Sequence, residues 1–218
     1  MGTYEVVACN YSEESENKIH SDTAAQTYGF SAALVPGVAV FGHMTYPMAE
    51  KYGDSWFKGN EVNLRILQPV YSGDTLSIEH KPSEDGYDIW CTARNGTLIA
   101  QMTSRPSIQK TDPIATAPGG LEEANRKEIN WDTIDIGCAL PSWVWQTSEI
   151  ENDAYTTEIS DPLDIYRAGQ VHPHALLSVS NQALSHYFNM PAWLHVGSKI
   201  QFRLPIRVGA KVRIRSVP

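Results

Sequence analysis

The chain carries the stretch ILQPVYSGDTLSI at residues 66–78 and a matching stretch, FRLPIRVGAKVRI, at residues 202–214. The proline, the turn glycine and the alternating apolar residues keep one offset throughout (202 − 66 = 136; 214 − 78 = 136). Alternation of apolar and polar residues is typical of a half-buried strand, and an intervening glycine marks a turn. Each stretch therefore predicts strand, turn and strand.

The same offset relates VPG at residues 35–37 to VHP at residues 171–173, and each tripeptide precedes a predicted helix. The first helix is expected over residues 38–50, where Val38, Phe41, Met44 and Met48 recur at helical spacing. The second is expected over residues 173–188. Because helix start, strand pattern and turn glycine keep one register without a gap, we infer an internal duplication. Two unrelated α+β segments that agree by chance are the alternative.

The rest of the first half fits the same scheme. A short strand is expected over residues 3–9, and a short helix over residues 21–28 that ends at Gly29. Pro47 should kink or end the first long helix, because proline cannot donate the next helical hydrogen bond. Two hairpin signals then separate strands over residues 76–78, 88–94 and 97–104.

These patterns divide the chain into an N-terminal domain (1–108), a linker rich in proline, glycine and polar residues (109–130) and a C-terminal repeat (131–218). Each half reads as a long apolar helix beside an antiparallel sheet, so the predicted class is α+β. Packing two such halves gives either two sheets or one continuous sheet over a shared core. The second half stops soon after Ile214 and by the repeat lacks its last two strands. We therefore expect an open sheet edge, covered by a capping loop or by a partner chain, as in a homodimer.

Composition limits the kinds of partner. The formal charge of −8 disfavours nucleic acid and anionic lipid. The basic stretch 199–215 alternates charged and apolar residues, which favours a solvated strand face over a polyanion site. No apolar run is long enough to cross a membrane, so a cytoplasmic location is expected. Cys9, Cys91 and Cys138 are too scattered for a disulfide framework or a zinc cluster, and each is expected to be a small buried hydrophobe.

One segment carries a chemical motif. It contains Asn17, Ile19, His20 and Asp22, followed by Gly29-Phe30 and Gly37. This arrangement resembles the signature of the MaoC-like, or R-specific enoyl-CoA hydratase, superfamily, which reads approximately Asp-x-Asn-Pro-[Ile/Leu]-His-x-Asp. The resemblance covers most of the first hundred residues. The second half resembles the companion repeat of that family and lacks the motif, because the constant offset places Thr156 opposite His20.

The resemblance implies a double hotdog fold and addition of water to an enoyl thioester, carried by CoA or an acyl-carrier protein, without a metal or redox cofactor. It implies His20 as acid/base, Asn17 as its support, and a carbonyl-binding backbone amide near Gly37. The chemistry is consistent, because a neutral imidazole can exchange protons near pH 7 and a helix N-terminus stabilises developing negative charge. The remaining candidates for substrate binding are Pro36, Val38, Asp22 and His43.

The motif also departs from the family. Ser15 stands where the family has its catalytic Asp, so Glu14 or Glu16 would have to replace that carboxylate. Three functions follow: hydration or dehydration, a binding module that has lost the chemistry, or thioester hydrolysis with Glu50 as the acid.

Several side chains keep a structural alternative. Asn17 could serve as a turn residue, Asp22 as a helix N-cap, and His43 as a packing residue. His172 and His174 are interpreted as structural or pocket-lining, because no Cys or carboxylate completes a metal site around them.

Overall fold

The structure is a computed structural model that describes residues 2–107 and 126–218. The first half contains β1 (Thr3–Val7), η1 (Lys18–His20), α1 (Asp22–Thr27), α2 (Gly37–Tyr52), η2 (Gly53–Phe57), β2 (Asn60–Ile66), β3 (Thr75–Ser83), β4 (Gly86–Ala93) and β5 (Leu98–Pro106). The second half contains β6 (Lys127–Glu128), β7 (Trp143–Trp145), α3 (Glu149–Glu158), α4 (Asp164–Arg167), α5 (Pro173–Ser185), β8 (Phe188–Asn189), β9 (Gly197–Phe202) and β10 (Val212–Ile214).

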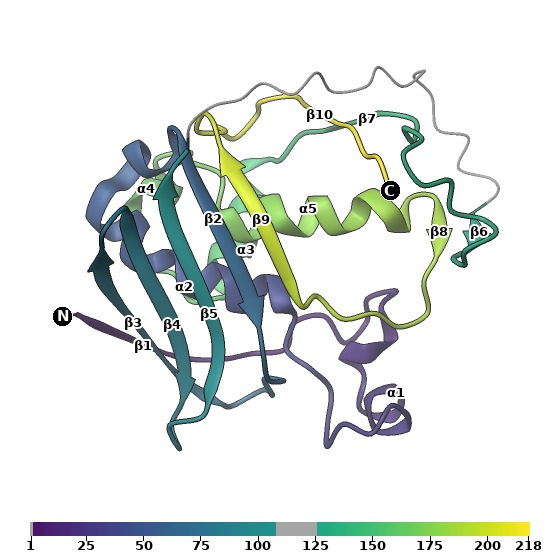
Figure 1. Cartoon of the computed structure of the whole chain (residues 1–218), viewed down its shortest axis with the longest axis horizontal. Coiled ribbons are helices and arrows are strands. Elements are labelled where there is room, and N and C mark those ends of the chain that lie inside the picture. The colour runs from purple at the N-terminus through teal and green to yellow at the C-terminus, as the bar shows by residue number, and fades with distance from the viewer. Residues whose placement is uncertain (1, 108–125) are drawn as a thin grey trace.

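One antiparallel sheet joins the two halves. Its strand order is β1-β3-β4-β5-β2-β9, so the first half supplies every strand except β9. The junction pairs β2 with β9 from Asn60 opposite Phe202 to Arg65 opposite Gly197. Figure 1 shows this sheet with α2 behind it and α5 extending from behind β9 away from the other strands. Of the two expected arrangements, the continuous sheet is therefore the one observed.

The core forms where the sheet faces the two long helices. Along β2, Val62 and Leu64 are buried while Asn63 and Arg65 are exposed, as the alternating sequence predicts. Helix α2 contacts β1, β3, β4 and α5. Side chains that are almost fully buried include Phe41, Met44, Met48, Leu64, Leu76, Ile78, Ile89 and Met102. Leu177 of α5 belongs to the same buried cluster, so both helices contribute to one core.

The internal duplication is confirmed by matching backbone contacts. Val35 N–H donates to the Val70 carbonyl at 2.8 Å, and Val171 N–H donates to the Ile206 carbonyl at 2.9 Å. These pairs are related by the predicted offset (171 − 35 = 136; 206 − 70 = 136). Isolated bridges repeat it too, since Leu34 pairs with Tyr71 and Gln170 with Arg207.

The offset fails in the segment before these contacts. Gly73 N–H bonds the Ala8 carbonyl, and Gly209 N–H bonds the Thr147 carbonyl (147 − 8 = 139). The second half is therefore three residues shorter between its first strand and its long helix. This difference falls between Ala8 and Val35, the region that contains the motif, so the pairing of His20 with Thr156 stays a prediction.

Two helix boundaries differ from expectation. Of the two expectations for Pro47, an end to the helix is wrong, because α2 continues to Tyr52, and a kink stays a prediction. Pro47 removes one hydrogen bond, but burial of nearly every residue around it stabilises the helix regardless. The second helix ends at Ser185 rather than at Phe188, which instead enters β8 and pairs with Lys127 of β6.

The structure tests the predictions for the linker and for the sheet edge only in part. Residues 109–125 of the linker lie outside the described residues, and residues 127–128 form β6. Strand β10 pairs with β7 and does not extend the large sheet. Within residues 2–107 and 126–218, β9 ends that sheet without a further strand on its outer edge. The partner or capping loop expected there remains a prediction.

Surface and cysteine expectations gave mixed results. In β9 and β10 the basic side chains are exposed and alternate with less exposed apolar ones, which confirms a solvated strand face there, whereas Leu204 between them is also exposed. The three cysteines are free, but Cys9 and Cys138 are exposed, so only Cys91 is the expected buried hydrophobe. No helix within the described part of the chain is long and apolar enough to cross a membrane.

Candidate active site

A cavity of about 950 Å³ lies between the N-terminus of α2 and the side of α5. Both halves contribute to its wall. The first half supplies the motif segment and the start of α2, and the second half supplies α5 and the loop 190–196 that precedes β9. Of the sequence-predicted residues, the cavity brings together Ser15, Glu16, Asn17, His20, Pro36, Gly37 and Val38.

His20 ends the short helix η1, which Asn17 caps by accepting the Ile19 N–H. The His20 side chain lines the cavity and is only 9% exposed. Its Nδ1 lies 2.8 Å from the Leu34 carbonyl oxygen, which can only accept a proton. Burial lowers the pKa of His20 below its ordinary value of 6.5. The ring is therefore neutral at pH 7, with its proton on Nδ1.

The hydrogen bonds of Asn17 determine the protonation state of His20 Nε2. Its Oδ1 accepts the Trp193 N–H at 3.1 Å, and its Nδ2 donates to the Trp193 carbonyl at 3.0 Å. This pair of bonds defines which end of the amide is which. Nδ2 is thus the atom 3.3 Å from His20 Nε2, and it donates to that nitrogen. His20 Nε2 therefore carries a lone pair, as a general base requires.

Changing Asn17 to Asp should alter this arrangement measurably. The second oxygen cannot donate to Trp193, and its charge beside His20 favours the imidazolium. We expect the pKa of His20 to rise and the free energy of unfolding to fall by about 1–3 kcal/mol. An NMR titration of the His20 ring and urea denaturation measure the two effects.

Asn63→Asp is the matched control, because Asn63 is an exposed residue of β2. A His20 pKa that stays unchanged in Asn17→Asp would contradict the assigned hydrogen bond.

The first turn of α2 supplies backbone donors to the same cavity. Pro36 is the N-cap, and Gly37 and Val38 line the wall. No residue in the described ranges accepts a hydrogen bond from the Gly37 or Val38 N–H. Free amides at a helix N-terminus carry partial positive charge, so they can bind a carbonyl oxygen or an enolate.

Gly37 is required at this position by close packing. A Cβ there would lie 2.9 Å from the Cβ of His195 and 2.9 Å from the His195 carbonyl oxygen. We expect Gly37→Ala to displace the loop 190–196 and to reduce the free energy of unfolding by about 1–3 kcal/mol. Urea denaturation tests this, with Gly2→Ala as control because nothing lies within 4 Å of a Cβ at Gly2. Equal stability of the two variants would show that the loop moves freely.

The expected replacement carboxylates do not reach His20 as free groups. Glu14 is exposed and does not line the cavity. Glu16 lines it but forms an ion pair with Arg126 at 2.6 Å, and this contact holds the pKa of Glu16 below its ordinary value. Ser15 lines the cavity and donates its hydroxyl to the Asn17 carbonyl at 3.2 Å. His20 is therefore not accompanied by an unpaired motif carboxylate.

Two proposed substrate-binding residues lie elsewhere. Asp22 is the first residue of α1 rather than its N-cap, which is Ser21, and its Oδ1 accepts the Ala33 N–H at 2.7 Å. That contact closes the loop after α1, so Asp22 faces away from the cavity. His43 is 2% exposed and is packed in the core, which supports the packing interpretation.

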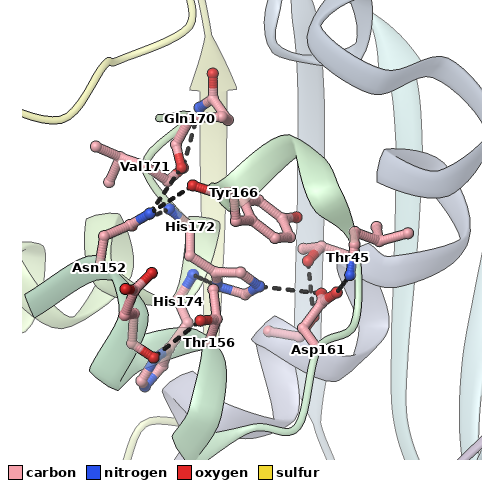
Figure 2. Close-up of polar contacts among 12 residues, drawn as sticks. Thr45, Asn152, Thr156, Asp161, Tyr166, Gln170, Val171, His172 and His174 are labelled. Carbon is pink, nitrogen blue, oxygen red and sulfur yellow. Dashed lines mark hydrogen bonds and ion pairs between the residues drawn. The ribbon is translucent and has the colours of Figure 1, made fainter. Parts of the chain in front are cut away.

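His172 and His174 belong to a buried polar network at the start of α5, which confirms the structural interpretation (Figure 2). The His174 N–H donates to His172 Nδ1 at 3.0 Å, so the His172 proton lies on Nε2, 3.2 Å from Asp161 Oδ2. In the first half His20 contacts the Leu34 carbonyl, whereas among residues 126–218 no histidine side chain is hydrogen-bonded to the corresponding carbonyl. Asn152 Nδ2 donates to that carbonyl, which belongs to Gln170, at 3.0 Å.

The cavity residues that the sequence analysis missed include Arg126, Trp193 and His195. His195 Nδ1 lies 3.0 Å from Asn181 Oδ1, and its Nε2 lies 2.9 Å from Ser198 Oγ. Burial lowers the pKa of His195. His195 and Trp193 lie in an irregular loop without periodicity or motif, so nothing in the sequence marked them.

Similar solved structures identify the fold. A MaoC-like dehydratase is 13% identical over 98% of this chain and 86% of that chain, with a TM-score of 0.57. A conserved protein from Mycobacterium tuberculosis, described as having a double hotdog fold, is 15% identical over 97% of this chain and 82% of its own, with a TM-score of 0.58. This chain has a double hotdog fold.

A third similar structure, described as a MaoC domain protein dehydratase from Chloroflexus aurantiacus, is 16% identical. That comparison covers 99% of this chain and 79% of the other, with a TM-score of 0.59. No protein-family model and no curated protein sequence matches the chain. At these identities the comparisons establish the double hotdog architecture and leave its chemistry to the site itself.

Proposed function

We propose that this double hotdog protein adds water to an enoyl thioester, or removes it from the 3-hydroxyacyl thioester, in the manner of an (R)-specific hydratase. The observation that carries the proposal is a neutral His20 with its basic Nε2 at the cavity wall, in the same cavity as the unbonded amides of Gly37 and Val38. The names of the similar dehydratases agree with this chemistry. The reaction leaves the oxidation level of the substrate unchanged and needs no redox cofactor.

The proposed reaction uses each group in turn. The thioester carbonyl oxygen accepts hydrogen bonds from the first amides of α2, which stabilise the enolate as it forms. When water replaces the Asn17 N–H at the single lone pair of His20 Nε2, this nitrogen takes a proton from the water while the water oxygen bonds to C3. The resulting imidazolium gives a proton to C2 from the same face. Addition is therefore syn, and one histidine performs both proton transfers.

Asn17 and Ser15 have supporting roles in this proposal. Asn17 donates to Nε2 in the resting site, which keeps the ring proton on Nδ1, and it anchors the loop over the cavity through Trp193. Ser15 contributes a hydroxyl but cannot accept a proton as a carboxylate would. We therefore expect turnover slower than an enzyme that uses a His–Asp pair.

A binding module without turnover is the second candidate. It is favoured by one observation, that Glu16 is occupied by Arg126 and Ser15 replaces the motif carboxylate. Thioester hydrolysis ranks third, because Glu50 lies near the far end of α2, accepts the Tyr46 hydroxyl and does not line the cavity.

One assay separates the three functions. Purified protein is incubated with enoyl-CoAs and saturated acyl-CoAs of short and medium length, and conjugated double bond and free thiol are followed. Loss of the double bond without thiol release supports hydration. Thiol release supports hydrolysis, and ligand binding without either change supports the binding module and overturns the proposed reaction.

A further inference from the structure

Helix α5 presents a polar wall to the cavity. The residues that it contributes are Ser178, Asn181, Gln182 and Ser185, spaced so that they share one helical face. No apolar side chain of α5 lines the cavity. By contrast, the first half contributes apolar side chains beside His20, including Ile19, Leu34 and Val38. Apolar side chains thus line the cavity near the proposed reacting atoms, and the face that α5 contributes is polar.

Much of this polar wall has no protein partner in the described part of the chain. His195 uses the Oδ1 end of the Asn181 amide, and no residue bonds its Nδ2. The side chains of Ser178 and Gln182 likewise have no hydrogen bond to a described residue. Polar groups that a ligand covers without pairing weaken its binding. A plain alkyl chain would leave these groups unpaired.

The wall runs along α5, starting from the exposed end of the cavity. Arg126, which pairs with the exposed Glu16, also donates to the Ser185 carbonyl at 3.0 Å, so the C-terminal end of the wall lies at this surface. Ser178 is seven residues earlier, which is about 10 Å along a helix. The proposed function places the large charged carrier at the exposed end, near Arg126. The wall around Ser178 and Asn181 then faces the acyl chain.

We propose that this wall selects thioesters whose acyl chain bears hydroxyl or keto oxygens beyond C3. The inference rests on the proposed function for its ligand class. The oxygens would pair with the free amide and hydroxyl groups of α5, while the carbons from C1 to C3 occupy the apolar side near His20. Unsubstituted fatty acyl groups would bind less well.

The test uses saturated ligands, so it does not depend on turnover. The ligands are the N-acetylcysteamine thioesters of hexanoic acid and of 5-oxohexanoic acid, and binding is measured by calorimetry. We expect the 5-oxo compound to bind about fivefold more tightly, the effect of one neutral hydrogen bond. The double variant Ser178→Ala, Gln182→Met should abolish this preference. Ser180→Ala is the matched control, since Ser180 is exposed and does not line the cavity.

Each outcome decides the proposal. Equal affinities in the unmodified protein, or a preference that survives in the double variant, would overturn it. The same acyl groups are then measured as CoA thioesters, to test whether the wall binds the carrier rather than the acyl chain. If the double variant binds both CoA thioesters equally more weakly and binds the N-acetylcysteamine thioesters as before, the wall binds the carrier and the proposal fails. A 5-oxo preference without hydration of the matching enoyl thioester would support the wall and contradict the proposed function instead.

Discussion

His20→Gln should lower kcat/KM for enoyl-thioester hydration by about 10²- to 10⁴-fold, the usual contribution of a general acid–base group. Glutamine keeps a polar side chain near the Leu34 carbonyl but cannot take up a proton near pH 7. The loss should fall on kcat, because His20 acts in the chemical step while the α2 amides still bind the thioester. Steady-state kinetics with a short enoyl-CoA measure the effect.

The pH profile adds a second readout for His20. A base must be unprotonated, so kcat/KM falls as pH drops through its pKa. Burial lowers the pKa of His20, so the acid limb should lie below 6.5, the value for an ordinary histidine. His80→Gln is the control, because His80 lies on β3 outside the cavity. Activity in His20→Gln within about threefold of the unmodified protein would remove His20 from the proposed mechanism.

Acidification should destabilise the protein through its buried histidines. Burial lowers the pKa of His43 from 6.5 to about 4, and it also lowers the pKa values of His172 and His174. In the unfolded chain these rings take up protons below pH 6.5, while in the folded protein they resist. Stability is therefore complete above pH 6.5 and falls as the pH decreases toward the folded pKa.

A single histidine should account for a large part of this loss of stability. The shift of His43 corresponds to a loss of about 3 kcal/mol between pH 7 and pH 4. His43 Nδ1 is buried without a partner among the described residues, so a leucine there would remove a polar group that nothing satisfies. Urea denaturation of His43→Leu at several pH values should show a flatter dependence than the unmodified protein. An unchanged slope would mean that other groups cause the acid sensitivity.

The fold was predictable because its signals are periodic. Alternation in β2, helical spacing in α2 and one offset between 66–78 and 202–214 each report a repeated geometry, and all three agree with the structure. Prediction failed where tertiary packing opposed a local rule. Pro47 is a helix breaker by its own chemistry, yet the core around α2 stabilises the helix beyond it.

The site was predictable only in its first-half part. The motif located Asn17, His20 and Gly37, which the structure places at one cavity. His43 was misplaced because helical spacing does not say which face of a fully buried helix meets a cavity. Arg126 and His195 reach the site from segments distant in the chain, so only the tertiary structure could bring them to light.

The junction between β2 and β9 has a consequence for how the chain folds during synthesis. Its paired residues are 132 to 142 positions apart (197 − 65 = 132; 202 − 60 = 142). Closing so long a loop is slow and entropically costly, and it must await the emergence of β9 from the ribosome. The strands of the first half are already complete by then. We therefore expect β2 to wait as an unpaired edge and to serve as the template on which the C-terminal half assembles last.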